Sequence, residues 1–245
     1  EEIARLELDV LFYQDIGMDA MAYMLAFARL APVQCVSFGH PNTTGIPTMD
    51  YFVSNDLFEA TGAETHYSER LVLLNDLPTL AYYLTPQPAT VVLDRAAFGL
   101  PRDANLYVCP QMLFKLHPDY DSVLAEILRR DARGLVVLIE GSVSHHTRTL
   151  QDRFRAAAAD VADRVVFLKR MNTNAFMGLL AVADVILDTL HFNGMNSSLE
   201  AFSVDAPIVT QPTELQRGRH TAGMYRRMGI DECIARDTIE YAELA

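Results

Sequence analysis

The segment ADVILDTLHFNGMNSSLEAF (183–202) decides the fold of this chain. It opens with an apolar run, VILD, that is typical of a buried strand, and it closes with residues at helical spacing. The loop between them is built from small polar residues of the kind that start a helix. A strand that leads through such a loop into a helix is the unit from which parallel α/β sheets are built.

The same alternation continues on both sides of this segment. Strands are expected at 105–109, 135–140, 164–169, 184–188 and 207–210, and helices at 118–131, 149–162, 173–183, 196–204 and 218–228. Strands and helices that alternate so regularly predict a doubly wound, Rossmann-like domain with a parallel sheet.

The first part of the chain follows a similar rhythm. Strands are expected at 8–14, 33–39 and 49–55, a helix capped by Asp19 at 19–30, and a turn of helix followed by another strand within 66–78. Prolines interrupt the next stretch, 78–104, which makes it the candidate boundary. We therefore expect an α/β fold in two domains, residues 1–104 and residues 105–245.

Composition excludes several classes of protein. The 245 residues are 50% hydrophobic and carry a formal net charge of −12, which provides a large core and argues against a nucleic-acid-binding protein. No apolar run is long enough for a membrane span, no signal peptide is visible, and the 3 cysteines are scattered, so we expect a cytoplasmic protein with no membrane partner. Because the chain starts at Glu1 rather than Met, we expect it to begin inside a larger protein.

Ligands of open parallel sheets bind in the loops that follow the carboxyl ends of strands, and this rule selects three loops. The first, 108–120, holds Gln111 and Lys115. Lys115 is one of only two lysines in the chain and stands near a helix start, where a phosphate could bind. From the residues alone, a solvated surface lysine stays open as the alternative.

The second loop lies in the segment quoted above and is rich in amides and hydroxyls, with Glu200 following in the first turn of the helix. A helix start of this kind can bind an anion, and the carboxylate is placed to bind a ribose diol. Ordinary capping, with Glu200 favourable to the helix dipole, stays open as the alternative. Neither the dinucleotide-binding glycine pattern nor the P-loop pattern occurs here.

The remaining candidates are basic or titratable side chains. The third loop, 211–223, carries Arg217, Arg219 and His220; the arginines could reach a diphosphate, whereas a lone loop histidine is usually solvated. His40 follows a strand of the first domain and is the best candidate for a general base, because the unperturbed pKa of histidine lies near neutrality. Asp9 is a weaker one.

The adjacent pair His145 and His146 lies in another strand-to-helix loop. No carboxylate stands at ligand spacing from the pair, so we expect no metal site there.

Several motifs occur in the order found in one known family. RLAPVQCVSFGHPNTTGIPTMDY (29–51), YSERLVLLNDLP (67–78), QMLFKLHPDY (111–120), the segment 183–202 and GIDECIARDTIEYAELA (229–245) resemble the catalytic region of the protein O-GlcNAc transferase family, which includes the bacterial adhesin N-glucosyltransferases. The resemblance implies a GT-B fold with two Rossmann-like lobes. Residues 1–104 would then be the C-terminal part of the N-terminal lobe plus a linker, that lobe being incomplete, and residues 105–245 the nucleotide-sugar-binding lobe.

The resemblance also assigns roles to the residues selected above. It implies that Lys115 binds phosphate, that Glu200 binds ribose and that His40 is the histidine of the family's Gly-His-Pro motif. The UDP-sugar site that we expect on this basis comprises Gln111, Lys115, Asn193, Gly194, Asn196, Ser197, Ser198, Glu200 and Arg219. The chain departs from the O-GlcNAc enzymes at Met195 and at Thr173, Phe176 and Leu179 of the helix near 173–179.

We therefore expect inverting, metal-independent transfer of a hexose or N-acetylhexosamine from UDP-GlcNAc or UDP-glucose to a Ser, Thr or Asn side chain of a protein or peptide. Lys115 and His40 are the expected catalytic residues, with no cofactor. Two alternatives stay open. A UDP-sugar epimerase or a small-molecule glycosyltransferase could use the same fold, and a degenerate member could be a binding module without activity.

Overall fold

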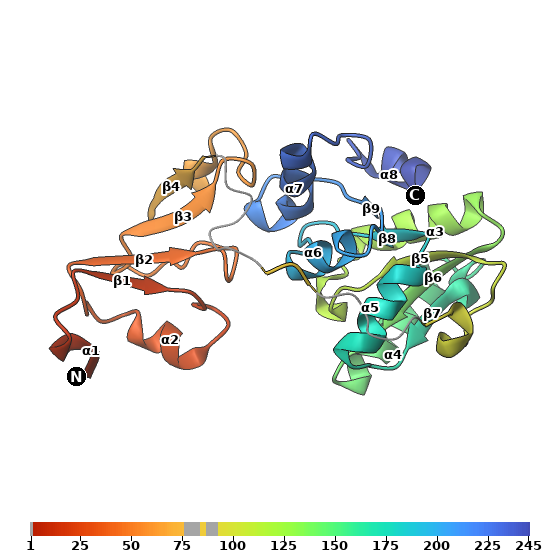
Figure 1. Cartoon of the computed structure of the whole chain (residues 1–245), viewed down its shortest axis with the longest axis horizontal. Coiled ribbons are helices and arrows are strands. Elements are labelled where there is room, and N and C mark those ends of the chain that lie inside the picture. The colour runs from red at the N-terminus through yellow and green to blue at the C-terminus, as the bar shows by residue number, and fades with distance from the viewer. Residues whose placement is uncertain (1, 76–83, 87–92) are drawn as a thin grey trace. The chain divides into compact units, whose positions relative to one another are not determined.

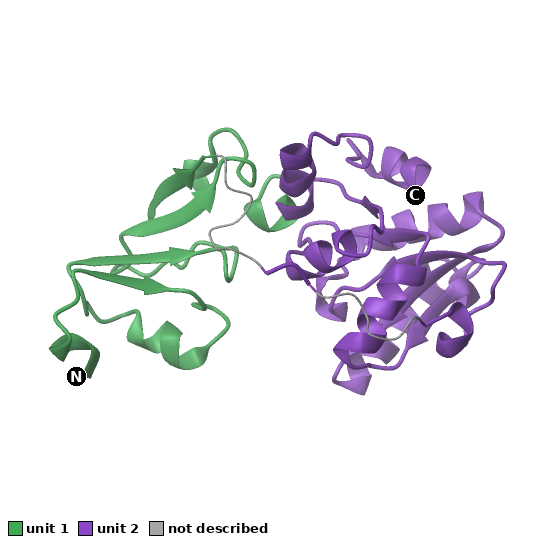
Figure 2. Ribbon diagram, viewed as in Figure 1, with its two compact units in different colours: residues 1–83, 214–219 green, residues 84–213, 220–245 purple. Residues whose placement is uncertain are grey.

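The computed structural model describes residues 2–75, 84–86 and 93–245. The chain forms two compact units (Figure 2): unit 1 comprises residues 1–83 and 214–219, and unit 2 comprises residues 84–213 and 220–245. Each unit has a parallel sheet of its own, which confirms the α/β class expected from the sequence.

The sheet of unit 1 has four parallel strands in the order β1-β2-β3-β4 (Figure 1). Its elements are α1 (Glu2–Arg5), β1 (Val10–Tyr13), α2 (Ala20–Leu25), β2 (Val33–Ser37), β3 (Tyr51–Asn55), the 3₁₀ turns η1 (Ala63–His66) and η5 (Gln216–Gly218), and β4 (Arg70–Leu74). Asp19 caps α2 as predicted, accepting a hydrogen bond from the backbone N of Ala22 at 2.7 Å. The helix ends earlier than predicted because Thr48 donates its hydroxyl to the carbonyl of Ala26, which a longer helix would use in its own ladder.

The sheet of unit 2 has five parallel strands in the order β7-β6-β5-β8-β9. Its strands are β5 (Asn105–Cys109), β6 (Gly134–Ile139), β7 (Val165–Leu168), β8 (Val185–Leu187) and β9 (Ile208–Val209). Its helices are α3 (Asp119–Arg130), α4 (Ser144–Ala157), α5 (Thr173–Val182), α6 (Asn196–Phe202), α7 (His220–Met228) and α8 (Thr238–Leu244), with 3₁₀ turns η2 (Arg95–Phe98), η3 (Leu113–Lys115) and η4 (Ala162–Arg164). The strand order reverses at β5, so the loops after β5 and β8 meet at the topological switch point where such sheets bind ligands.

Alternate residues of β5 point into two separate cores, one on each face of the sheet. Tyr107 and Cys109 pack with α3, α4 and α8, while Leu106 and Val108 pack with residues of α5, α6 and α7. Burial of both faces explains why these strands are nearly continuous apolar runs in the sequence. The sheet is thereby fixed between helices, and its loops extend from a rigid base.

The first division between the compact units lies at residues 83/84, within the proline-rich stretch 78–104. Arg95 forms two hydrogen bonds, of 2.7 and 2.8 Å, with the carboxylate of Asp184, and Leu100 is buried against the α5 and α6 side of the sheet. The described residues 93–104 therefore belong to unit 2, although their prolines and loops suggested a linker. Much of the expected linker, 76–83 and 87–92, lies outside the described residues.

The helix expected at 149–162 begins five residues earlier, as α4. Its first turn contains the polar residues Ser144, His145 and His146, which are exposed and so carry no apolar periodicity. Thr147 anchors this turn, because its hydroxyl accepts a hydrogen bond from the backbone N of Gly141 at 3.2 Å. In the described part of the chain, no helix is both long and apolar enough to cross a membrane.

Candidate functional site

Lys115 is held between the two loops of the switch point in unit 2. Its Nζ donates to Oε1 of Gln111 at 3.1 Å and to the backbone carbonyl of Asn193 at 3.0 Å. The same ammonium group lies 4.3 Å from the centre of the Phe192 ring, a cation–π distance. Lys115 is thus a positioned cation and not the solvated lysine that the residues alone left open.

Lys115 is a partly buried cation whose positive charge is only partly compensated by nearby negative charge. Burial lowers the pKa of Lys115 below its ordinary value, and the negative charge of Asp188 opposes this shift only in part. Lys115 donates only to neutral groups, Gln111 and Asn193, in its two hydrogen bonds. An anion placed against Nζ would therefore gain more than it would from a lysine in water.

Gln111 connects Lys115 to the start of α6. Its Nε2 donates to the hydroxyl of Ser197 at 2.7 Å, while its Oε1 accepts from Lys115. Gly194 makes this approach possible, because a Cβ at that position would lie 2.5 Å from both Nε2 of Gln111 and Oγ of Ser197. The glycine at this position is therefore required by close packing of the polar side chains around it.

Asp188 supports the loop after β8 through a hydrogen bond to Gly194. It is 1% exposed, and it accepts hydrogen bonds from the backbone N of Gly194 at 2.8 Å and from the hydroxyl of Thr210 at 2.9 Å. Burial raises the pKa of Asp188, while its hydrogen bonds and the charge of Lys115 act in the opposite direction. This carboxylate fixes the loop that carries Asn193, Gly194 and Ser197.

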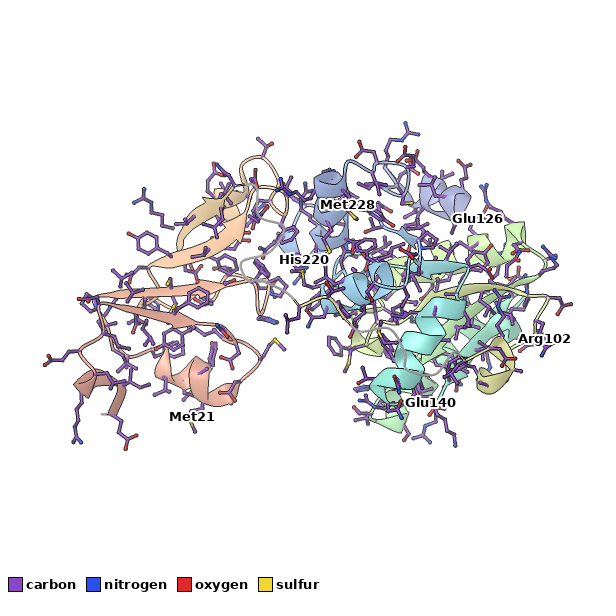
Figure 3. The ribbon with its side chains drawn as sticks, in the orientation of Figure 1. Met21, Arg102, Glu126, Glu140, His220 and Met228 are labelled. Carbon is purple, nitrogen blue, oxygen red and sulfur yellow. The ribbon has the colours of Figure 1, made fainter. Side chains whose placement is uncertain are left out.

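A cavity of about 230 Å³ opens beside this group at the carboxyl ends of β5, β6 and β7. Its lining includes Gln111 and Glu200, and also Glu140, which follows β6 and is labelled in Figure 3. Burial raises the pKa of Glu200 above its ordinary value. The full lining is Pro110, Gln111, Met112, Leu113, Ile139, Glu140, Gly141, Arg170, Met171, Thr173, Phe176 and Glu200.

The residues where the chain departs from the O-GlcNAc enzymes lie in different surroundings. Thr173 and Phe176 line the cavity, whereas Leu179 is fully buried in the core behind it. Met195 precedes α6 and provides no side-chain cap for that helix. Only the first two can therefore alter the lining of the cavity directly.

The other expected site residues of this segment lie at the start of α6. Asn196 is the first residue of the helix, and Ser198 is buried, with its hydroxyl 2.8 Å from that of Thr221 in α7. Ser198 is therefore used within the fold, while Ser197 contacts Gln111 and through it Lys115.

His40 and Arg219 belong to unit 1, whereas the other expected site residues belong to unit 2. Within unit 1, Nε2 of His40 lies 3.1 Å from Nδ2 of Asn42, and Arg217 donates to Oδ1 of Asn42 at 3.0 Å. Burial, and then the charge of Arg217, lowers the pKa of His40 below its ordinary value. Both effects favour the neutral form of this imidazole.

Sequence reasoning missed three residues that shape the site in unit 2. Asp188 and Phe192 stand in the quoted segment, but only the fold shows that they support the loop and the lysine. His220 was expected to be a solvated loop histidine, and that expectation is wrong: it is 2% exposed at the start of α7. Burial, with a contribution from Lys115, lowers the pKa of His220 to about 3. The strand-end position of Asp188 was the one available signal.

Comparison with known proteins gives one family. The sequence model of glycosyl transferase family 41 matches residues 81–245. The chain is 28% identical over 223 residues to a probable UDP-N-acetylglucosamine–peptide N-acetylglucosaminyltransferase, SEC, of Arabidopsis thaliana, covering 88% of this chain and 22% of that protein. It is 23% identical over 242 residues to a UDP-glucose:protein N-beta-glucosyltransferase of Actinobacillus pleuropneumoniae serotype 7 (strain AP76), covering 96% of this chain and 37% of that protein.

A solved structure supports the same grouping. A mutant of the Thermobaculum terrenum O-GlcNAc transferase superposes with a TM-score of 0.80 at 27% identity, covering 99% of this chain and 45% of that one. The sucrose-phosphate synthase of Thermosynechococcus elongatus, at 12% identity and a TM-score of 0.59, shares the fold alone. The chain spans between 22% and 37% of the two curated relatives named above.

Proposed function

The chain belongs to glycosyl transferase family 41, and from this membership we propose that it carries the nucleotide-sugar site of a protein glycosyltransferase. The reaction is inverting transfer of a hexose or N-acetylhexosamine from a UDP-sugar to a Ser, Thr or Asn side chain, without a metal ion. UDP-GlcNAc and UDP-glucose are the candidate donors, because they occur in the names of the relatives. The fold is of the GT-B type.

The observation that carries this proposal is the ammonium group of Lys115 at the switch point. When the sugar leaves UDP, negative charge grows on the β-phosphate, and a positioned cation in a partly buried site stabilises that charge strongly. Lys115 is held in place before the substrate arrives, by Gln111 and Asn193, so little reorganisation is needed. This cation takes the role that a divalent ion has in metal-dependent transferases.

The neighbouring cavity suits the nucleoside part of the donor. At about 230 Å³ it is smaller than the roughly 300–1,000 Å³ of pockets for drug-sized ligands, so it fits a base and its ribose better than a whole sugar nucleotide. Glu200 lines the cavity and offers two carboxylate oxygens to a ribose diol. Gln111 lines the cavity too and also contacts Lys115, which connects a nucleoside pocket to a phosphate site.

For the general base we propose His40. A base must be unprotonated before it can accept the proton of the acceptor side chain, and the lowered pKa of His40 meets that condition at pH 7. Its hydrogen-bonding partner Asn42 fixes the orientation of the ring. The acceptor itself follows from the relatives, whose names specify peptide and protein acceptors.

Substitution of Lys115 tests the proposal. In the full-length protein, Lys115→Ala and Lys115→Met should lower the rate of transfer from UDP-sugar to peptide by about 10²–10³-fold, as for loss of an oxyanion donor. Lys169→Ala is the matched control, because Lys169 is the other lysine of the chain and is exposed. Transfer is measured by mass spectrometry of peptides with a panel of UDP-sugars, and UDP binding by calorimetry, with and without EDTA.

The outcomes separate the proposed function from its alternatives. Near-normal transfer by Lys115→Ala would remove this lysine from the mechanism, and loss of transfer on adding EDTA would contradict the metal-free reaction. Sugar turnover without transfer to peptide would indicate an epimerase or a small-molecule glycosyltransferase. Absence of UDP binding would indicate a binding module without activity.

A further inference from the structure

Three side chains of unit 2 that the nucleotide site does not use converge on one point. Oδ2 of Asp119 lies 3.2 Å from Nδ1 of His117 and 3.0 Å from Nε2 of His191. The two imidazole rings lie edge to face, with centres 4.9 Å apart. All three ligand atoms lie within 4.8 Å of one another.

The backbone of two different loops brings these residues together. His117 and Asp119 flank Pro118 at the start of α3, and His191 lies 72 positions further on, in the loop after β8. His191 adopts a φ of 65°, a left-handed conformation that a histidine rarely takes. The fold thus holds His191 in a costly conformation, and in that conformation its ring lies against Asp119.

Nδ1 of His117 and Oδ2 of Asp119 lie beside each other, and both atoms can act as metal ligands. The backbone N of Asp119 donates to Nδ1 of His117 at 3.2 Å, so this nitrogen is unprotonated and its lone pair serves as an acceptor. The carboxylate oxygen of Asp119, also an acceptor, lies 3.2 Å from the same nitrogen. A cation bound between Nδ1 and this oxygen would replace the backbone hydrogen bond of His117 and interact with both groups.

We propose that His117, Asp119 and His191 bind one divalent transition-metal ion of the Zn²⁺ class. Imidazole nitrogen and carboxylate oxygen are ligands that Zn²⁺ takes at about 2.0–2.2 Å, which in a tetrahedral site places neighbouring ligand atoms roughly 3.3–3.6 Å apart. The two separations involving Asp119, 3.2 and 3.0 Å, are within about 0.3 Å of that range, so small side-chain rotations would fit an ion. The ligands are Nδ1 of His117, Oδ2 of Asp119 and Nε2 of His191.

The surroundings suit an accessible ion with water as a further ligand. All three side chains are about half exposed, so ions reach them from solvent. None of them lines the cavity beside Glu200. The ion would join the loop after β5 to the loop after β8, and it has no role in the proposed transfer chemistry, so this inference does not rest on that function.

Calorimetric titration of the full chain with ZnCl₂ tests the site, with any histidine tag removed. The variants are Asp119→Asn, which removes the charge at constant shape, and His191→Asn, because asparagine tolerates the left-handed backbone of that position. The control is the double variant His145→Ala and His146→Ala, in the exposed first turn of α4. Thermal unfolding without metal checks that each variant is folded.

The expected result is one Zn²⁺ per chain, with affinity at least about 10-fold lower in each cluster variant and unchanged in the control. Co²⁺ in place of Zn²⁺ should give visible d–d absorption that is lost in the same two variants, and Mg²⁺ should not compete, because it prefers oxygen ligands. Absence of saturable Zn²⁺ binding would show that the cluster is only a surface group of hydrogen bonds. Equal affinity in wild type and cluster variants would also overturn the proposal.

Discussion

At the scale of single residues, the position of Lys115 was predictable and its partners were not. A lysine before a helix, after a strand of a parallel sheet, is recognisable from local sequence. Its acceptor on Asn193 is 78 positions away, and its ring partner Phe192 is an unremarkable aromatic residue in the sequence. Local patterns identify which residue is chemically apt, whereas the fold determines what restrains it.

His220 provides a prediction about acid stability. Its pKa falls to about 3 in the fold, against an ordinary value of 6.5, so the unfolded chain binds a proton over a range where the folded chain does not. Stability must then decrease as the pH falls below about 6.5, at about 1.4 kcal/mol per pH unit. Between pH 7 and pH 5 we expect the free energy of unfolding of unit 2 to fall by about 2 kcal/mol more in the wild type than in His220→Gln.

Urea titrations at several pH values, followed by hydrogen exchange at the amides of β5 and β6, measure this difference. His145→Gln is the control, because this histidine is exposed and its surroundings change little on unfolding. A wild type and a His220→Gln variant with equal pH dependence would contradict the prediction.

At the scale of elements, the loop from Asp188 to Ser198 acts as one unit. Asp188 accepts a hydrogen bond from the backbone N of Gly194. Because Gly194 has no Cβ, the side chains of Gln111 and Ser197 can approach it closely and form a hydrogen bond with each other. Removing one small contact should therefore displace several groups that hold Lys115. This coupling follows from packing density, since close-packed polar groups have no free volume into which to move.

Gly194→Ala tests the coupling. The added Cβ would lie 2.5 Å from Nε2 of Gln111 and must push it away, which releases one partner of Lys115. We expect UDP affinity, measured by calorimetry, to fall at least about 10-fold, because displacements near 1 Å have large effects in such sites. Gly229→Ala is the opposite case: its φ is 73° and nothing lies within 4 Å of the new Cβ.

The control should lose about 1–2 kcal/mol of stability through its left-handed backbone and keep its UDP affinity. If the two alanine variants bind UDP equally well, Gly194 is not part of the site.

Elements with a strong apolar rhythm were predicted well. β5 was predicted at its observed bounds, 105–109, since its residues are buried on both faces. α4 was misplaced because its first turn is polar and its predicted end, rich in alanine, lies beyond the true one. The sequence did not predict the cluster of His117, Asp119 and His191, because the two histidines lie far apart in the chain and not at a spacing typical of metal ligands.

At the scale of the whole molecule, sequence order and spatial grouping differ at one point. Residues 214–219 stand between β9 and α7 of unit 2, but they belong to unit 1. The sequence placed this stretch in the second domain because no local pattern indicates that the chain packs against the first unit again at this point. The contact that fixes the segment is a buried polar one, which hydrophobic periodicity does not reveal.

Gln216 is the residue of this segment on which the assignment depends. It is 2% exposed, and its Nε2 donates to the hydroxyl of Ser54 in β3 at 2.6 Å; that hydroxyl in turn donates to Glu59 at 2.6 Å. Gln216→Ala removes this hydrogen bond and leaves a small void, at a cost of about 1–2 kcal/mol. Hydrogen exchange at the amides of β3 should therefore become about 5–30-fold faster, while exchange at β5 and β6 stays as in the wild type.

Glu214→Ala is the matched control from the same segment. Its carboxylate is 82% exposed and lies 3.6 Å from His66, and an ion pair with one partner so fully in solvent contributes little to stability. Its exchange rates should match the wild type in both sheets. Faster exchange in both sheets of Gln216→Ala would mean that the segment stabilises the two units equally, and unchanged exchange in β3 would mean that it is not part of unit 1. Acceleration confined to unit 1 is expected because the hydrogen bond that Gln216→Ala removes is with Ser54 in β3.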